Sequence, residues 1–254
     1  MVTPHSLSSF CMMGGQGTPG SVTVRRSPTR VAYCDASLPP DLVDTLWSDP
    51  TSLLDRGELL RAVGKRRTVR LEWASQQFVL KHYLERNWWR ALKRAGRRSR
   101  AASTWIVMQK LVDAEIPTPR PVACIENRWG LFRWDSFLMY PYVEGETLRS
   151  YYEQTTDQAR TQNLRQQLKA LWRQLSQLRV SLADTNLRNF IVCPAGQVWA
   201  IDLDGSRVHR SAFLTEHFQR RAWKRLLRST ISSKRRGAEQ REARDLARGV
   251  ATSS

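Results

Sequence analysis

The sequence predicts an α+β protein of two lobes, the first rich in β-strands and the second rich in helices. Residues 59–73 and 76–84 alternate β-branched or aromatic side chains with polar ones, a pattern that is typical of strands. Residues 157–178 instead repeat leucine at intervals of three and four positions, which is the spacing of one helical face. Strand signals therefore dominate the first part of the chain, and helix signals dominate the later part.

Length and composition limit the classes of protein that fit this chain. Its 254 residues, 41% hydrophobic and 25% charged, are typical of a globular protein with one large domain or two lobes. No apolar run approaches the roughly 20 residues that a membrane-spanning helix needs. The four cysteines are far apart and lack metal-binding spacing, which favours a reduced, cytoplasmic protein over a disulfide-stabilised one.

The charge balance is strongly basic, with a formal net charge of +18. Such a surplus indicates a polyanionic partner, which is nucleic acid, an acidic membrane face or an anionic substrate, although it also serves solubility alone. The basic tract of residues 86–112 interleaves Arg with Trp88 and Trp89. That pattern suits nucleic acid, an anionic leaflet, or a solvated helix with its tryptophans in the core.

The first lobe is expected to follow a disordered segment. Residues 1–34 contain no acid and are rich in Ser, Thr, Gly and Pro, so residues 1–40 are predicted to be disordered. A β-rich lobe then covers residues 41–140, with short helical turns first and hairpin turns at Gly64-Lys65 and Ala74-Ser75. Within this lobe, a basic helix over residues 88–112 comes after the hairpins, and a proline-rich stretch ends it before the next strand.

The second lobe is predicted to cover residues 141–232. After the long helix, residues 189–194 and 197–203 predict a β-hairpin whose turn is Ala195-Gly196. A packed basic helix over residues 217–230 completes this lobe. Residues 233–254 predict a basic, flexible tail.

Oxygen-bearing side chains are brought to one end of the predicted hairpin. Asp184 and Asn189 are separated by four residues, and Asp202 ends the second hairpin strand, with Asp204 on the same face if the strand continues. Carboxylate and amide oxygens suit Mg²⁺, which completes its shell with substrate phosphates. Each residue alone is also a common turn or strand-end residue. Their joint spacing favours a catalytic site.

These residues resemble the catalytic motifs of protein-kinase-like folds. The D-x-x-x-x-N spacing from Asp184 to Asn189 is similar to the kinase catalytic loop, and "AIDLDG" resembles the metal-binding segment that follows it. Lys81 in "FVLKHY" resembles the strand lysine that holds nucleotide phosphates. Gly64 in "VGKRRTV" occupies the place of the phosphate-covering hairpin loop, and "MYPYVEG" that of the hinge that binds adenine through its backbone.

Within that superfamily, the sequence most resembles the lipopolysaccharide core kinases, the Kdo/heptose kinases. The segments "VLKHY", "RRSRAAST", "EIPTPRPVA", "LMYPYVEG" and "IDLDG" follow that family's order over roughly residues 55–230. The resemblance implies a bilobal protein-kinase-like fold with ATP and Mg²⁺ as cofactors. In the implied site, Asp184 is the catalytic base, Asn189, Asp202 and Asp204 hold the metal, and Lys81, Gly64, Met139, Tyr140 and Tyr142 bind the nucleotide.

The implied reaction is transfer of the γ-phosphoryl group of ATP to a Kdo or heptose hydroxyl of the lipopolysaccharide inner core. The resemblance places the enzyme in the cytoplasm, as a peripheral protein at the cytoplasmic face of the inner membrane. Its expected partners are the core glycolipid and the anionic membrane surface, and nucleic acid becomes the less favoured partner of the basic tract. The oligomeric state does not follow from the sequence.

Two departures from the kinase pattern keep a pseudokinase scaffold open as an alternative. Leu182 stands two residues before Asp184, where the usual loop has a histidine. No acid lies between Glu85 and Asp113, so Lys81 has no obvious ion-pair partner on the following helix. A small-molecule phosphotransferase of the aminoglycoside or choline type shares the Asp/Asn/Asp order, but its acidic acceptor pocket fits this basic chain less well.

Overall fold

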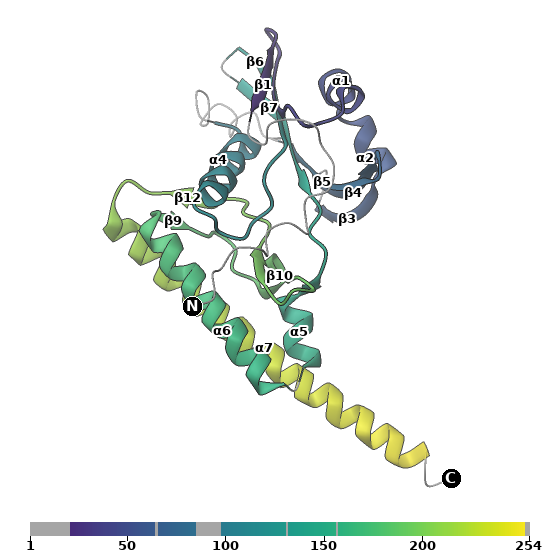
Figure 1. The fold of residues 1–254 in the computed structure, drawn as a ribbon, viewed down its shortest axis with the longest axis vertical. Helices are drawn as coiled ribbons and strands as arrows, with labels where there is room; N and C mark the ends of the chain where they lie inside the picture. The colour runs from purple at the N-terminus through teal and green to yellow at the C-terminus, as the bar shows by residue number, and fades with distance from the viewer. Residues whose placement is uncertain (1–20, 64–65, 85–97, 131, 156, 252–254) are drawn as a thin grey trace, which may run out of the picture.

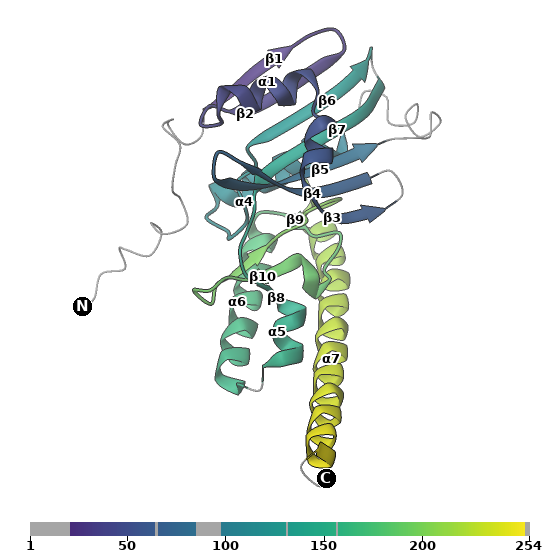
Figure 2. The same ribbon diagram turned by 90° about the vertical axis from the view of Figure 1, so that its right-hand side faces the viewer.

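A seven-stranded antiparallel sheet forms the first half of the protein (Figure 2). The computed structural model describes residues 21–63, 66–84, 98–130, 132–155 and 157–251. The strand order in the sheet is β1-β2-β6-β7-β5-β4-β3. The strands are β1 (Val22–Arg26), β2 (Arg30–Asp35), β3 (Glu58–Val63), β4 (Arg66–Trp73), β5 (Gln76–Leu84), β6 (Ala123–Trp129) and β7 (Phe132–Pro141).

Strands β1 and β2 correct the prediction that residues 1–40 are disordered. Residues 22–35 form a hairpin, and β2 pairs with β6 over five residue pairs. Ala32 and Cys34 are almost fully buried in the core on one side of the sheet. The acid-poor composition hid a short alternating strand whose apolar positions are buried by distant segments, among them β6 and α1. Residues 1–20 lie outside the described residues.

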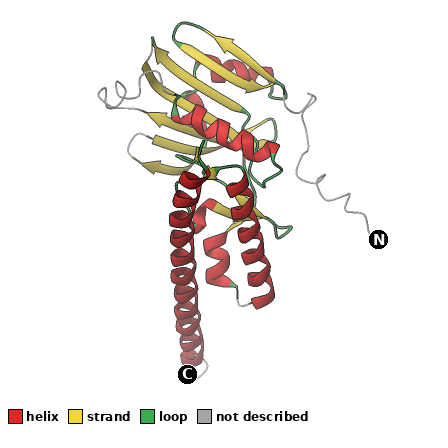
Figure 3. Cartoon of the chain, turned by 90° about the vertical axis from the view of Figure 1, so that its left-hand side faces the viewer, coloured by secondary structure: helices red, strands yellow, loops and turns green. Residues whose placement is uncertain are grey.

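Helices cover both faces of the sheet. On one face, α1 (Pro40–Ser48) and α2 (Ser52–Arg56) insert four buried leucines against β4, β5 and β7: Leu42, Leu46, Leu53 and Leu54. These helices confirm the predicted helical turns. On the other face lies α4 (Arg100–Asp113), which packs on β6 and β7 (Figure 3). This helix coincides with the later part of the predicted helix 88–112, whose residues 88–97 lie outside the described residues.

The second half is mainly helical (Figure 1). Helix α6 begins after Asp157, whose side chain caps it by accepting a 3.0 Å hydrogen bond from the backbone N–H of Arg160. Its predicted leucine face is buried. The remaining elements are β8 (Glu146–Thr147), α5 (Leu148–Gln154), α6 (Gln158–Gln177), β9 (Val180–Ser181), the 3₁₀ turn η1 (Leu187–Asn189), β10 (Phe190–Val192), β11 (Val198–Ala200), β12 (Arg207–Val208) and α7 (Ala212–Ala251).

The C-terminal residues correct a second expectation. Helix α7 continues to Ala251, so residues 233–251 are helical where a frayed tail was predicted (Figure 1). The repeated Arg, Glu and Ala residues of this segment favour helix, which outweighs the lack of an apolar periodic face. The α+β fold class, with strands first and helices second, is confirmed.

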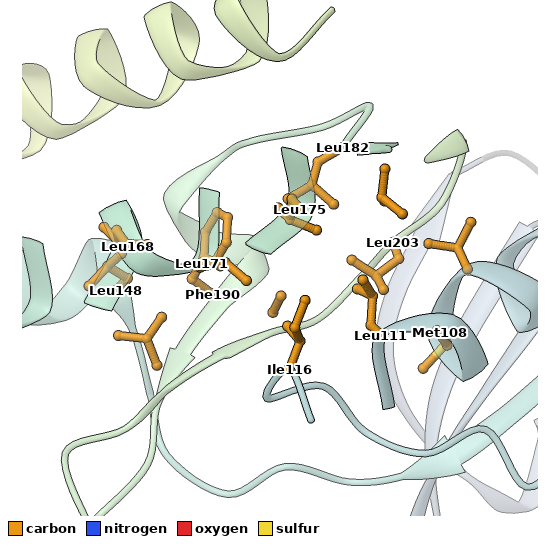
Figure 4. Close-up of a cluster of buried hydrophobic side chains, with 14 of the residues drawn as sticks. Met108, Leu111, Ile116, Leu148, Leu168, Leu171, Leu175, Leu182, Phe190 and Leu203 are labelled. Atoms are coloured by element: carbon orange, nitrogen blue, oxygen red, sulfur yellow. The ribbon is translucent and has the colours of Figure 1, made fainter. Parts of the chain in front are cut away.

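A shared core joins the two halves and fixes the later loops against the sheet. One cluster of buried side chains contains residues of β5, β7 and α4 together with residues of α5, α6, α7 and β10. Figure 4 shows part of this cluster, in which α4 and the segment after it meet the helical half, with Met108, Leu111, Ile116, Leu171, Leu175, Leu182, Phe190 and Leu203 among its members. None of the helices in the described ranges is long and apolar enough to span a bilayer.

Candidate active site

The loop of residues 182–189 is held in one conformation by hydrogen bonds within itself. The carboxylate of Asp184 accepts a 3.2 Å bond from the backbone N–H of Asn186, and the side chain of Asn186 caps η1 by accepting from Arg188. The side-chain amide of Asn189 donates back to the carbonyl of Asp184 at 3.2 Å. Asp184 is exposed whereas Asn189 is 7% exposed. The loop thus presents one carboxylate to solvent and buries one amide beneath it.

Asp202 is brought beside Asn189 by the predicted hairpin. Strands β10 and β11 pair from Phe190↔Ala200 to Val192↔Val198, and the pairing extends by a 2.8 Å bond from Ile201 N–H to the carbonyl of Asn189. The next residue, Asp202, has a φ of +54°. Asp adopts this left-handed region more readily than most residues, so the backbone can turn out of the strand at Asp202. The hairpin therefore delivers Asp202 to the loop that carries Asp184 and Asn189.

Lys81 reaches the same place from the sheet. Its side chain is 7% exposed, and its ammonium donates to the carboxylate of Asp202 and lies 3.3 Å from that of Asp204. Burial alone would lower the pKa of Lys81, but Tyr140, Asp204 and Asp202 outweigh this effect and raise the pKa above its ordinary value. The ammonium is therefore charged at neutral pH. Its acidic partners, Asp202 and Asp204, come from the segment after β11. They supply the ion pair for which the sequence showed no acid on the following helix.

Tyr83 is a site residue that sequence reasoning missed. It lies two positions after Lys81 on β5, so its side chain points to the same face, and its hydroxyl donates to Asp204 at 2.5 Å. Burial and the nearby Asp204 raise the pKa of Tyr83 well above its ordinary value, so the phenol remains a neutral donor. Burial also raises the pKa of Asp204, an effect that Lys81 partly offsets. The i, i+2 spacing of Lys81 and Tyr83 was the available signal.

Arg61 is a second residue that the sequence did not single out. It pairs across β3 and β4 with Thr68, and Thr68 pairs across β4 and β5 with Lys81. Residues directly opposite in an antiparallel sheet project from the same face, so Arg61 and Lys81 face the same side. The guanidinium of Arg61 lies 3.7 Å from Asp202, on the carboxylate oxygen that Lys81 does not contact. Asp202 thus lies between two cations.

The predicted nucleotide-binding residues of β7 point in different directions. Tyr140 lies against Lys81, with the ammonium 5.9 Å from the ring centroid, and burial raises its pKa to about 12. Met139 points to the opposite face, into the core beneath α1 and α2, and its carbonyl accepts a bond from Val122. Tyr142 follows β7, and its ring contacts Arg70. The structure therefore brings Tyr140, but not the Met139 side chain, to Lys81; Gly64 lies outside the described residues.

The donor types fit a magnesium ion. Asp202 and Asp204 provide two carboxylates, and Asn189 pairs through its backbone with Ile201, the residue before Asp202. Magnesium commonly uses one or two carboxylates and takes its other ligands from water and phosphates. Within the described ranges no group of three or more His, Cys, Asp or Glu side chains is arranged so that it could hold a metal ion. Both carboxylates already have protein partners: Asp202 pairs with Lys81 and Arg61, and Asp204 accepts from Lys81 and Tyr83, so a bound ion would share them with these groups.

The sequence of the chain matches a known protein family. A sequence model described as the Lipopolysaccharide kinase (Kdo/WaaP) family matches residues 52–249. The chain belongs to this family. The matched range includes every residue of the site described above, from Arg61 to Asp204. The resemblance to the lipopolysaccharide kinases is thereby confirmed, whereas the roles of individual residues in the Kdo/WaaP chain remain predictions.

Solved structures and curated proteins add less. The kinase PK-1 of Cydia pomonella granulovirus is similar to this Kdo/WaaP chain with 14% identity and a TM-score of 0.44, over 68% of this chain and 59% of that kinase. The chain thus spans less than two thirds of the length of PK-1. No curated protein matches the chain.

Proposed function

We propose that this chain is an ATP-dependent kinase that phosphorylates a Kdo or heptose hydroxyl of the lipopolysaccharide inner core. The observation that carries the proposal is the meeting of Lys81 from the sheet with Asp202 from the hairpin, next to Asn189. Phosphoryl transfer depends mainly on positioning and charge neutralisation, which such a cluster of opposite charges supplies. Membership of the Kdo/WaaP family supports the choice of lipopolysaccharide as acceptor.

In this proposal each residue has a separate task. Lys81 binds the α- and β-phosphates, and Asp184, on the exposed loop, accepts the proton of the attacking sugar hydroxyl. The new bond forms between the sugar oxygen and the γ-phosphorus, and the bond from that phosphorus to the bridging oxygen breaks, so ADP leaves with the electron pair. Bound Mg²⁺ would neutralise charge on the phosphate oxygens, and Asp202 and Asn189, with Asp204 beside them, are the residues that would hold it.

The location of the acceptor favours work at the cytoplasmic face of the inner membrane, with the anionic lipid surface as a partner. The net charge of +18 supports this part of the proposal, because core sugars and lipid headgroups are both anionic. Exposed basic residues of α7, which lie away from Lys81 and Asp202 in the sequence, add to this positive charge.

Transfer of radiolabelled phosphate from ATP to purified core oligosaccharides tests the proposal. Parallel acceptors that end in Kdo or in heptose identify the sugar. Asp184→Asn is the matched variant, because its amide oxygen can still accept the bond from Asn186 that shapes the loop. We expect the variant to bind ATP normally and to transfer phosphate about 10²- to 10⁴-fold more slowly. Equal rates for the two proteins would refute a catalytic role for Asp184.

A pseudokinase scaffold is the second candidate, and one observation favours it. Leu182, which stands in the place of the usual histidine, is 5% exposed and is part of the core, so it offers no polar group to the loop. Mg-ATP binding without any turnover by the wild-type protein, under conditions where Asp202→Ala abolishes binding, would favour the scaffold over the kinase.

A further inference from the structure

The outward side of α7 combines exposed apolar and basic side chains. Between residues 213 and 231, five apolar side chains have between 41% and 76% of their surface exposed: Phe213, Leu214, Phe218, Leu227 and Ile231. Five exposed cations lie among them: Arg220, Arg221, Lys224, Arg225 and Arg228. We call these ten residues the outer face of α7. Glu216, the one acid between positions 213 and 231, pairs with Arg220 at 2.5 Å.

Helical periodicity places this face opposite the packed side of the helix. Phe213 and Ile231 lie five turns apart on one line, and the ten residues of the outer face together cover about half of the helix circumference. On the far side, Ala222 and Leu226 are each 1% exposed and belong to the core shared with α6. Figures 2 and 3 show α7 along one side of the helical half, which leaves part of its surface uncovered by α5 and α6.

The combination of apolar and basic side chains on the outer face indicates which kind of partner fits it. An exposed apolar surface of this kind marks an interaction site, and its cations decide between candidates. A second copy that docked on the same face would bring five cations against five. A nucleic acid would neutralise the cations but would leave Ile231 and Leu227 without a partner, because aliphatic side chains do not stack on bases. An anionic bilayer offers phosphates to the cations and an acyl layer to the apolar side chains.

We propose that the outer face of α7 docks the protein on an anionic phospholipid surface, with this part of the helix lying in the plane of the interface. The sequence placed membrane contact on residues 86–112 instead, of which residues 86–97 lie outside the described residues. The docking surface deepens the membrane contact of the proposed function by assigning it to named residues, and it does not depend on the phosphotransfer itself.

The opposite side of the same helix is bound to the catalytic loop. The hydroxyl of Thr185, the neighbour of Asp184, donates to the carbonyl of Ala222 at 2.9 Å. The amide of Gln219 donates to the carbonyl of Val180 at 2.7 Å, at the start of the segment that leads into the loop. The helix that docks on lipid therefore also fixes the position of Asp184, so docking holds the predicted catalytic base at a set place relative to the membrane.

Co-sedimentation with vesicles tests the proposal. The full chain is mixed with vesicles of phosphatidylcholine alone or of phosphatidylcholine with phosphatidylglycerol. We expect binding only to the anionic vesicles, weakened by salt. Phe213→Asn with Ile231→Asn is expected to lower the partition coefficient at least about tenfold. Neutralising Arg221, Lys224 and Arg228 to Gln is expected to lower it about a hundredfold.

Helix α6 offers the matched control. Its exposed Arg165, Lys169 and Arg173 are changed to Gln, which removes the same charge from another helix. We expect this triple variant to bind within about threefold of wild type, since distant charges are screened. Equal losses in the two triple variants would overturn the proposal, because binding would then follow net charge rather than the outer face. Normal vesicle binding by the double Asn variant would overturn it as well.

Two further measurements separate the alternatives. If the wild type is a dimer in analytical ultracentrifugation and the double Asn variant is a monomer, a second copy covers the face and the proposal fails. It also fails if DNA duplex binds more tightly than anionic vesicles. Phosphate transfer to a soluble core oligosaccharide is measured on the same variants and is expected to be unchanged. A wild-type protein that transfers phosphate but does not bind anionic vesicles would refute the docking surface alone. A wild-type protein that binds anionic vesicles but does not transfer phosphate would refute the kinase alone.

Discussion

Lys81 and Asp202 are 121 residues apart in the sequence, yet the ammonium of the first donates to the carboxylate of the second. This contact joins β5 to the segment after β11 and so links the sheet to the hairpin at the candidate site. Asp204 lies on the same ammonium at 3.3 Å. The site is therefore an ion cluster assembled between the two halves, and its properties depend on the charge of Lys81.

The charge of Lys81 should persist well into the alkaline range. Its pKa is raised above the ordinary value of about 10.4, so the stability that its ion pairs contribute is fully present below that pH and is lost only as the pH rises through the folded-state pKa. We expect Lys81→Met to lower the free energy of unfolding by about 2 kcal/mol. The difference should be constant between about pH 6 and pH 10 in urea unfolding series.

Lys169→Met on α6 provides the control for this measurement, because Lys169 is exposed. It should match the wild type across the same range. A Lys81 difference that declines between about pH 7 and pH 9 would mean that the ammonium titrates there and that its pKa is not raised.

Tyr83 and Asp204 should act as a pair. The phenol donates to the carboxylate at 2.5 Å and helps to hold it toward Lys81. We expect Tyr83→Phe to slow phosphate transfer about tenfold, since one hydrogen bond to a charged group is lost. Asp204→Asn should slow it more, and the double variant should resemble Asp204→Asn with a coupling energy of at least about 1 kcal/mol. Strictly additive effects in steady-state kinetics would argue against this pair.

Arg61 should contribute to nucleotide binding. It shares a cross-strand row with Lys81 and contacts Asp202 at 3.7 Å, so phosphates bound at Lys81 would lie within its reach. We expect Arg61→Gln to raise KM for ATP about tenfold with little change in kcat. Arg67, on the neighbouring strand, pairs instead with Asp55 of α2 on the other face of the sheet. Arg67→Gln should leave KM unchanged, and the same rise in both variants would point to general electrostatics.

Gly145 should tolerate no side chain. Its φ is +143°, and an added Cβ would lie 2.4 Å from the carbonyl oxygen of Val192, because β8 approaches β10 closely there. We expect Gly145→Ala to destabilise the protein by about 3 kcal/mol or more through strain and overpacking. Gly130→Ala, where φ is +58° and the added Cβ meets no atom within 4 Å, should cost about 1 kcal/mol. Similar losses in denaturant unfolding would show that conformation alone matters at Gly145.

Local signals in the sequence determined much of the fold. The leucines of α6 repeat at three and four positions, so the helix predicted over residues 157–178 and its buried face followed from the pattern, whereas the structure added Asp157 as the cap. The turn at Ala74-Ser75 and the β10–β11 hairpin were also predicted, because alternation and turn chemistry act over a few residues. The order of Lys81, Asp184, Asn189 and Asp202 was enough to suggest the kinase family, which the match over residues 52–249 confirms.

The tertiary structure alone decided which of these residues meet. Strand β2 of the β1–β2 hairpin pairs with β6, for example Arg30 with Asn127, about a hundred residues later in the sequence. The composition of residues 22–35 gave no sign of that partner. The facing direction of Met139 and Tyr140 depends on which side of the sheet each helix covers. Arg61 and Tyr83 join the site only because strand pairing and the hairpin bring them to Asp202 and Asp204. Periodic patterns depend on residues that are close in the sequence and can be recognised from it. Long-range ion pairs depend on how the whole chain packs, which is the result of many weak contacts between distant segments.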